Sequence, residues 1–383
     1  MQKSTIEEIR AWLTLACARD LGTAVLEELL TIFGSAAAVA AAGRSQLMSA
    51  GVSQATAAKL AQPDEARVNM GLQWLDSHSS HHLIVWGSAG YPLLLAEIPD
   101  PPLVLFAKGR KSALCDPQLA IVGSRNPSPS GSENAFEFAR HLADCGLTIV
   151  SGLAMGVDAQ AHKGALAAGA PTLAICGTGL DLVYPAQHQS LAGKIGETGL
   201  LVSEFFPGTP PRRENFPRRN RLISGLSTGV LVVEAGLRSG SLITARLAAE
   251  QGREVFAIPG SIHNPLARGC HLLIRKGAKL VETAADVLSE LGSLVSLTQD
   301  LSASPPPDTD RSGPELDEEY AKLLEACGYE SVTVDLLVER TRLTAAEVSS
   351  MLLILELQGF LESGPGGRYI RVFKTQNQKE VTK

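Results

Sequence analysis

The spacing of hydrophobic residues changes along the chain. In residues 1–65 apolar side chains recur at helical spacing, with Ile6, Ile9 and Leu13 on one face and short breaks at "FGS", "AGRS" and "AGVS". This pattern predicts a small bundle of short helices. The Gly-containing turns at 21–22 and 50–53 resemble those of helix-hairpin-helix motifs, which can present backbone N–H groups to phosphates, although such turns also simply connect helices.

The pattern then changes to short apolar runs typical of strands. Runs at 83–86 and 103–107, punctuated by Gly and Pro, predict strands with turns within 66–115. Farther on, apolar runs alternate with helical stretches. These runs lie at 119–124, 147–152, 171–177, 199–205, 228–235, 253–260 and 278–283. Strands that are apolar throughout and separated by helices predict an α/β domain over 66–297, with a Rossmann-like parallel sheet covered on both faces.

The C-terminal part is predicted to be a separate domain. Residues 298–313 are rich in Pro, Ser and Asp and predict a flexible linker. Residues 314–373 have the order of three helices and a hairpin, which suggests a winged helix, and 374–383 form a tail. This domain has eleven acidic and five basic residues, a net charge of −6. Its expected recognition helix, 344–358, has no Lys or Arg, so a protein contact or a stabilising role is favoured over groove reading.

Composition narrows the class of protein. A chain of 383 residues with 45% hydrophobic and 19% charged residues is typical of a globular protein of two or three domains. It has no apolar run of eighteen residues, and its first ten residues are unlike a signal peptide, so we expect a cytoplasmic protein without membrane association. The six cysteines form no CxxC pair, and the histidines at 78, 81 and 82 lack further ligands nearby, so no metal site is expected.

Loops of small residues follow successive strands of the predicted sheet. Neither GxGxxG after the first strand nor GxxxxGK[ST] occurs, so no nucleotide cofactor is expected. The loops instead contain Gly123, Ser124 and Arg125; then Gly152 and Gly156; then "GTG" at 177–179; and finally Ser239, Gly240 and Ser241. Small residues let backbone N–H groups approach a ligand, and helix N-termini favour anions. Together the loops predict a phosphate-binding rim, although any one of them could be only a tight turn.

Several residues are candidates for catalysis, but none completes a catalytic arrangement. Asp158 and His162 have the i, i+4 spacing of an acid/base pair, yet a local hydrogen bond or cap is favoured because no nucleophile or metal set accompanies them. Glu204 and Glu234 could pair as carboxylates or could each hold a loop. We therefore expect that the protein is not an enzyme.

The segment "PPRRENFPRRNRLISG" (210–225) concentrates positive charge. It holds five arginines within 212–221, whereas the whole chain has 34 Lys+Arg against 40 Asp+Glu. Pro217 suits the first turn of a helix, which places 218–221 at the positive end of the helix dipole, an arrangement that makes sense if an anion binds there. Phe216 could stack on a nucleobase, an interaction of roughly 1–3 kcal/mol. The alternative is that Phe216 is buried and the arginines pair with nearby acids.

These motifs, taken in order, resemble the DNA processing protein A family, also called Smf. The motifs are "GSR" followed by "SxxG", "SGLAMGVDAQAH", "GTGLDLVYP", "FPRRNRLISGLS", "VVEAGLRSGSLITA" and "VFAIPG". The resemblance implies a SAM-like N-terminal domain and a protein that is not known as an enzyme. It also implies a homodimer that binds single-stranded DNA, protects incoming DNA in natural transformation and loads RecA recombinase.

The resemblance also implies which residues contact DNA. Arg125, Arg213, Phe216, Arg219 and Arg221 match the motif positions, while Ala186 stands where some relatives have a lysine, which puts a DNA contact there in doubt. With the strand-end loops, the expected DNA-binding residues are Gly123, Ser124, Arg125, Gly152, Gly156, Arg213, Phe216, Arg218, Arg219, Asn220, Arg221, Ser239, Gly240 and Ser241. Two other functions stay open: a nucleotide-processing enzyme similar to phosphoribohydrolases, and a protein–protein adaptor dominated by the winged helix.

Overall fold

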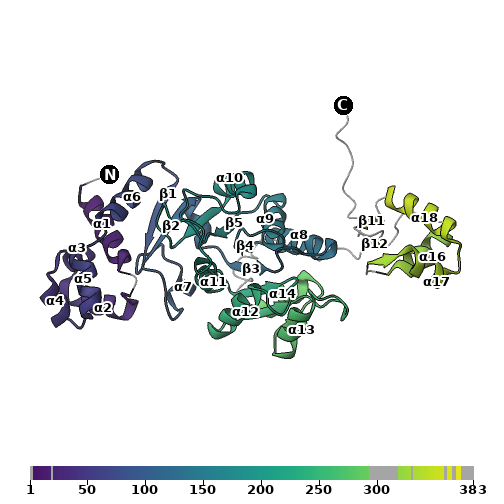
Figure 1. Ribbon diagram of the computed structural model, residues 1–383. Coiled ribbons are helices and arrows are strands. Elements are labelled where there is room, and N and C mark those ends of the chain that lie inside the picture. Colours follow the sequence, from purple (N-terminus) through teal and green to yellow (C-terminus); the bar gives the residue numbers. More distant parts are fainter. Residues whose placement is uncertain are drawn as a thin grey trace. The chain divides into compact units, whose positions relative to one another are not determined.

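The computed structural model describes residues 3–18, 20–292, 318–328, 331–357, 360–364 and 368–371 (Figure 1). The chain divides into two compact units, residues 1–300 and 301–383. The linker predicted at 298–313 and the tail predicted at 374–383 lie outside the described residues. Within the described ranges, no helix combines the length and apolar character that crossing a membrane requires.

The chain begins with short helices, as predicted. They are α1 (Lys3–Cys17), α2 (Thr23–Phe33), α3 (Ala36–Ala41), α4 (Arg44–Ser49) and α5 (Gln54–Ala61). Serine caps start two of them: the Ser35 hydroxyl accepts a hydrogen bond from the N–H of Ala38, and Ser53 accepts one from Thr56. Their apolar faces join one cluster with Phe106 and Phe206 of the sheet domain, so the helical bundle packs against that domain.

The segment 66–115 begins with a helix, not with the strands that the sequence suggested. Helix α6 (Glu65–Asp76) is capped by Asp64 and buries Val68, Gly71 and Trp74, which recur every three residues. Apolar and polar residues are mixed between these positions, so the helical period does not stand out in the sequence. The strands follow as β1 (His81–Val85) and β2 (Val104–Gly109), separated by the short helix α7 (Leu93–Ala96).

The centre of the molecule is a nine-stranded sheet. Strands β3 (Gln118–Val122), β4 (Thr148–Ser151), β5 (Thr172–Ile175), β6 (Leu200–Ser203), β7 (Gly229–Val232), β8 (Glu254–Ala257) and β9 (Lys279–Leu280) match the seven predicted runs. The order is β1-β2-β6-β5-β4-β3-β7-β8-β9, and all pairs from β6 to β9 are parallel. Strands β4, β5 and β6 follow one another on one side of β3, and β7, β8 and β9 follow one another on its other side. That reversal is the topological switch point where such sheets bind ligands.

Helices cover both faces of the sheet (Figure 1). On one face lie α8 (Pro129–Asp144) and α9 (Val157–Ala167). On the other lie α11 (Asn215–Leu226), α12 (Ser241–Glu250) and α13 (Arg268–Arg275). Helices α10 (Gln189–Thr198) and α14 (Ala284–Leu291) complete the domain. The parallel-sheet α/β fold predicted from the alternating pattern is therefore confirmed.

The C-terminal unit has the elements of a winged helix. Helices α16 (Glu318–Cys327), α17 (Val334–Thr341) and α18 (Ala345–Leu357) are followed by strands β11 (Leu361–Gly364) and β12 (Arg368–Arg371). A short strand, β10 (Val332–Thr333), pairs with β12, giving the sheet order β10-β12-β11. Leu323, Leu337, Val348 and Leu352 form its core. On α18, Leu353 and Ile354 are exposed together with Glu347, Ser349 and Ser350, so the described surface of this helix mixes apolar, hydroxyl and acidic side chains and has no cation.

Candidate functional site

A pocket of about 710 Å³ lies at the carboxyl edge of the sheet. The loops after β3, β4 and β7 meet there with the first turns of α11 and α12. Nine of the expected residues line it: Gly123, Arg125, Arg213, Phe216, Arg219, Asn220, Ser239, Gly240 and Ser241. Three arginines and one aspartate, Asp158, are the charged residues of this lining, so the pocket favours an anion.

Arg219 is the most unusual residue of the pocket. It is only 4% exposed, and among the described residues neither its Nε nor its Nη1 has a hydrogen-bond partner. Burial lowers the pKa of this guanidinium, while the carboxylate of Asp158 acts in the opposite direction. A buried cation without hydrogen bonds is costly, because the water it has lost is not replaced. Nε and Nη1 of Arg219 are therefore donors that a hydrogen-bond acceptor of a ligand could satisfy.

Gly152 makes room for the Arg219 guanidinium. A Cβ atom placed on Gly152 would lie 1.6 Å from Nη1 and 2.5 Å from Cζ of Arg219. Real carbon atoms do not approach so closely, so a larger residue at 152 would have to displace the guanidinium. Gly152 thus acts through Arg219 and does not itself line the pocket.

Asp158 fixes the loop after β4. Its Oδ2 accepts hydrogen bonds from the N–H groups of Gly152 (3.1 Å) and Ala154 (3.3 Å). Burial raises the pKa of this carboxyl, and the charge of Arg219 opposes that effect. The local cap favoured by the sequence is what the structure shows.

His162 lies below the pocket in the core. It is fully buried, its Nδ1 lies 2.8 Å from the hydroxyl of Thr172, and burial lowers its pKa to about 3. The imidazole is therefore neutral at physiological pH. Asp158 and His162 each hold structure and do not point at a common reacting centre.

Two aromatic rings and an arginine form one wall of the pocket. The ring of Phe216 is half-buried, and its centroid lies 5.5 Å from that of Tyr184. The guanidinium carbon of Arg125 lies 5.8 Å from the Phe216 centroid, within the range of a cation–π contact. The expectation of an aromatic face beside the arginines therefore matches the geometry. Sequence reasoning missed Tyr184 as a lining residue, although "YP" directly follows the "GTG" loop.

The loop after β3 depends on a close approach to α9. Gly156 has φ +78°, and a Cβ atom there would lie 2.4 Å from the carbonyl oxygen of Ser124. The Val157 N–H donates to that oxygen at 3.1 Å. Ser124 and Gly156 therefore position Arg125 from behind the pocket, and neither is among its lining residues.

The helix-end loop after β7 is tied to α11. The Ser239 and Ser241 hydroxyls lie 2.7 Å apart, and the Asn220 amide donates to the carbonyl of Gly240 at 3.4 Å. Thr244, one turn into α12, also lines the pocket and was not anticipated. This loop and the first turn of α12 thus bring hydroxyl groups to the lining of the pocket.

Arg218 and Arg221 do not line the pocket. Arg218 Nε lies 3.1 Å from Glu204 Oε1, and Arg221 pairs with both Glu204 and Asp100. The Glu204 side chain is 4% exposed and that of Arg221 is 12% exposed, so this network is largely buried. For these two arginines the geometry matches the alternative that the segment pairs with nearby acids. The reason is helical: side chains at 218 and 221 share a face of α11 that turns away from 219.

Glu234 also holds a loop. Its carboxylate accepts hydrogen bonds from the N–H (2.8 Å) and hydroxyl (2.6 Å) of Ser128, at the start of α8. Glu204 and Glu234 therefore have separate partners, as the loop-holding interpretation expected.

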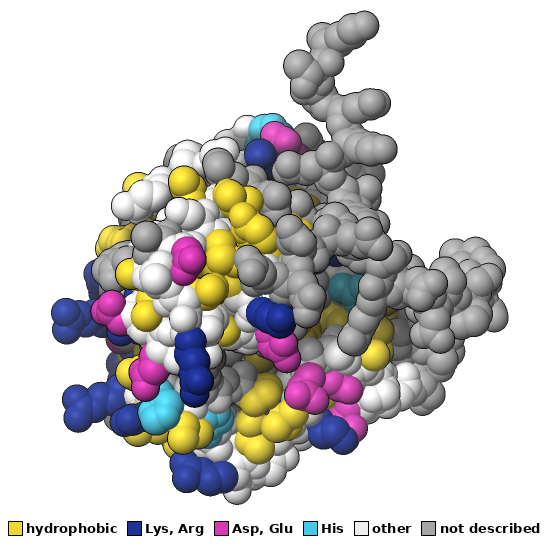
Figure 2. Space-filling model, turned by 90° about the vertical axis from the view of Figure 1, so that its right-hand side faces the viewer, with side chains coloured by type: hydrophobic (Ala, Val, Ile, Leu, Met, Phe, Trp, Pro, Cys, Tyr) yellow, Lys and Arg dark blue, Asp and Glu magenta, His cyan; other side chains and the backbone are white. Residues whose placement is uncertain are grey.

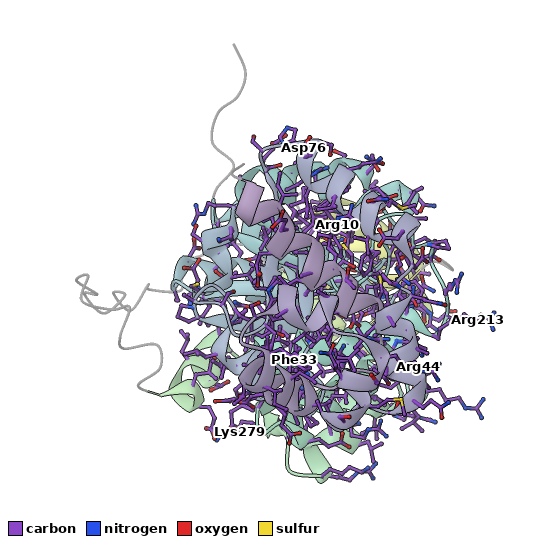
Figure 3. All side chains as sticks on the ribbon, turned by 90° about the vertical axis from the view of Figure 1, so that its left-hand side faces the viewer. Arg10, Phe33, Arg44, Asp76, Arg213 and Lys279 are labelled. Atoms are coloured by element: carbon purple, nitrogen blue, oxygen red, sulfur yellow. The ribbon has the colours of Figure 1, made fainter. Side chains whose placement is uncertain are left out.

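Arg213 extends outward at the edge of the molecule (Figure 3). In the view of Figure 2, by contrast, hydrophobic, basic and acidic side chains are mixed among the described residues. The excess of arginine at the pocket is thus a local feature, consistent with a chain whose net charge is −6.

Comparisons with known proteins agree with this arrangement. The model of the family "DNA recombination-mediator protein A" matches residues 82–292, and that of the "DprA winged helix domain" matches 305–367. The chain is 45% identical over 306 residues to Protein Smf of Escherichia coli, covering 80% of this chain and 81% of the relative. It is 50% identical over 200 residues to DNA processing protein DprA of Streptococcus pneumoniae, covering 52% and 71%.

Solved structures show the same similarity. The X-ray structure of DNA processing protein A from Streptococcus pneumoniae superposes with a TM-score of 0.64 at 38% identity, covering 72% of this chain and 95% of that one. A structure of DNA processing protein A from Helicobacter pylori, concerned with its unique single-stranded DNA binding mode, has a TM-score of 0.50 at 31% identity and covers 55% and 95%. By its sheet, its C-terminal winged helix and these matches over most of its length, the chain belongs to the DNA recombination-mediator protein A (DprA/Smf) family.

Proposed function

We propose that this protein binds single-stranded DNA in the carboxyl-edge pocket and acts as a recombination mediator that protects incoming DNA and loads RecA during natural transformation. Family membership supports the mediator role, and the related Helicobacter pylori protein has a described single-stranded DNA binding mode. Loading of RecA and a homodimer are parts of the proposal that rest on the family resemblance alone, and a cytoplasmic location rests on the sequence composition.

One observation carries the binding proposal: the buried guanidinium of Arg219 has unpaired donors in a pocket that it lines. A DNA phosphate is an anion with several acceptor oxygens, so it satisfies these donors. Arg125, from the loop after β3, and Arg213, from the same segment as Arg219, add charge at this site. Three cations that converge from two segments of the chain fit a polyanion better than a single small anion.

The aromatic wall favours a single strand over a duplex. In a duplex the bases are stacked on one another, whereas an unpaired base can lie against Phe216 or Tyr184. Stacking of this kind tolerates every base, so we expect little sequence preference.

We propose binding, and not catalysis, as the activity of the pocket. The two residues nearest to an acid/base pair, Asp158 and His162, are used in backbone and core hydrogen bonds. The nucleotide-processing enzyme has less support for this reason. Release of free base from nucleoside monophosphates by the purified protein would support the enzyme alternative.

The test is the affinity for a fluorescent oligo-dT, measured by anisotropy beside a duplex of equal length. We expect the wild type to prefer the single strand, with affinity that falls as salt rises because phosphate contacts release counterions. Arg125→Glu should weaken binding strongly. The matched control is Arg44→Glu, an equally exposed arginine on α4 outside the pocket (Figure 3). Equal affinities of the two variants would contradict the proposal.

A further inference from the structure

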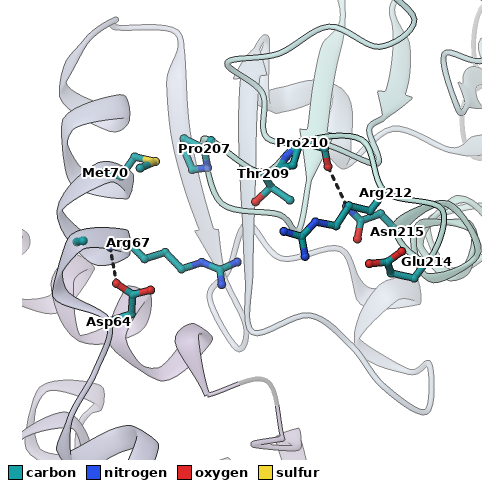
Figure 4. A pocket seen from close by; sticks show the side chains of 11 residues that line it. Asp64, Arg67, Met70, Pro207, Thr209, Pro210, Arg212, Glu214 and Asn215 are labelled. Atoms are coloured by element: carbon teal, nitrogen blue, oxygen red, sulfur yellow. Dashed lines mark hydrogen bonds between the residues drawn. The ribbon is translucent and has the colours of Figure 1, made fainter.

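A second cleft, of about 300 Å³, lies between helix α6 and the loop after β6 (Figure 4). Asp64, Arg67 and Met70 line it on the side of α6. The loop after β6 and the start of α11 form the other side, with Pro207, Gly208, Thr209, Pro210, Arg212, Glu214 and Asn215. The expected DNA-binding residues do not include any of these.

The two pockets share one wall. Arg212 lines the smaller cleft and Arg213 the larger pocket, and likewise Asn215 lines the first and Phe216 the second. Asn215 is buried and anchors this wall, because its amide donates to the carbonyl oxygens of Gly177 (3.0 Å) and Pro210 (3.4 Å). A ligand that leaves the larger pocket over the 210–216 segment therefore enters the cleft directly.

The chemistry of the cleft suits a nucleotide. The guanidinium groups of Arg67 and Arg212 reach toward one another from opposite sides (Figure 4). Arg67 lies over the ring of Phe206, 4.5 Å from its centroid, which fixes its direction. Met70 is 43% exposed and, with Pro210, offers apolar surface beside these charges.

Two acids also line the cleft, so its formal charge is balanced. The Asp64 carboxylate is engaged as the cap of α6, where it accepts a hydrogen bond from the N–H of Arg67 at 3.0 Å. Glu214 is exposed at the start of α11. A cleft with two cations and two acids would bind a free anion weakly. It can bind a phosphate of a strand that already occupies the larger pocket, because the second contact is then intramolecular.

We infer that the DNA strand held in the larger pocket continues across the 210–216 wall into this cleft, where Arg67 and Arg212 clamp the next backbone phosphate. The inference rests on the proposed function and extends it: helix α6 supplies part of the single-strand path. The site would then take a longer strand than the larger pocket alone can hold.

A length series tests this inference. Affinities are measured for oligo-dT from about 4 to about 20 nucleotides, which brackets single-strand site sizes of roughly 4–16 nucleotides. Arg67→Glu and Arg212→Glu should leave the shortest oligonucleotides unaffected and weaken the longest by roughly tenfold or more. For the longest oligonucleotide, neutral Arg67→Ala should also lower the salt slope by about 0.7, the value of one phosphate contact. Arg67→Lys should retain most of the wild-type affinity, and Arg44→Glu on α4 should change little at any length.

The outcomes separate the two proposals. If Arg125→Glu abolishes binding but Arg67→Glu and Arg212→Glu match Arg44→Glu at every length, the extended path is wrong and the proposed function stands. If both cleft variants weaken short and long oligonucleotides equally, the cleft is not a separate segment of the path and the inference is overturned. If the wild type binds none of the oligonucleotides, both proposals fail. The exposed Arg212 variant keeps the test valid should Arg67→Glu misfold.

Discussion

Replacing Arg219 with methionine should weaken DNA binding without weakening the fold. Methionine has a similar length and fills the buried space without a charge. The variant loses the donors that we assign to a phosphate, and a hydrogen bond to a charged group contributes about 1.5–3 kcal/mol. At about 1.4 kcal/mol per factor of ten, the dissociation constant should rise roughly 10- to 150-fold.

The stability of the unliganded protein should respond differently. Nε and Nη1 of Arg219 make no hydrogen bond to the described residues, so the mutation breaks none at these atoms. Asp158 keeps its two backbone donors, and burial has already raised the pKa of its carboxyl, so it can take up a proton when the arginine is gone. Replacing a whole buried ion pair by apolar side chains is often neutral or stabilising, and a protonated Asp158 would likewise leave no buried charge uncompensated. We therefore expect an unchanged or higher melting temperature.

The assay pairs fluorescence anisotropy for binding with thermal unfolding for stability. A structural ion pair would behave in the opposite way, since breaking a buried pair costs about 3–5 kcal/mol. For a domain of this size, 3 kcal/mol corresponds to a fall in melting temperature of roughly 6–12 °C, at about 2–4 °C per kcal/mol. A fall of that size with unchanged DNA affinity would refute the assignment of Arg219 as a ligand-binding residue.

Three further predictions follow from the same geometry. Gly152→Ala should weaken DNA binding about as much as Arg219→Met, because its methyl group takes the place of the guanidinium; calorimetric titration with oligo-dT would show this, and wild-type affinity in a folded variant would contradict it. Arg221→Met should do the reverse, lowering the melting temperature by leaving the buried Glu204 carboxylate without one of its partners while DNA affinity changes little. His162 has a pKa lowered to about 3, so unfolding takes up a proton below pH 6.5; its contribution to stability is complete above pH 6.5 and is lost toward pH 3 at up to about 1.4 kcal/mol per pH unit. Thermal unfolding of His162→Gln from pH 6.5 to about 5 should show a shallower slope than the wild type, and an equal slope would refute the prediction.

The sheet could be predicted from the sequence because its signal is local. Each of the seven parallel strands is a short apolar run between turn residues, and the carboxyl ends of parallel strands meet at one edge. That rule was enough to predict that Gly123, Arg125 and Ser239 lie at one site, although Ser239 is far from the other two in the chain, and all three line the pocket. Helix α6 was missed because its fully buried positions, Val68, Gly71 and Trp74, include a glycine, and because apolar residues also occur between them, which blurs the helical period.

The roles of individual arginines could not be predicted in the same way. Arg218, Arg219 and Arg221 are equivalent as members of a basic run, but the helix sends 219 toward the pocket and the other two toward Glu204. Which face of α11 meets the pocket depends on its packing on the sheet, and that is a tertiary property. The cleft beside α6 was hidden for the same reason, since Arg67 and Arg212 lie far apart in the sequence and meet only in the folded chain.

Photo-cross-linking tests the central claim most directly. An oligonucleotide with 5-iodouracil in place of thymine is bound to the wild-type protein, irradiated, and the cross-linked peptides are identified by mass spectrometry. We predict cross-links at Phe216 and Tyr184, whose rings form the aromatic wall of the pocket, and their loss in Arg219→Met at the same concentrations. Cross-links confined to the winged helix, or unchanged by the substitution at 219, would contradict the account.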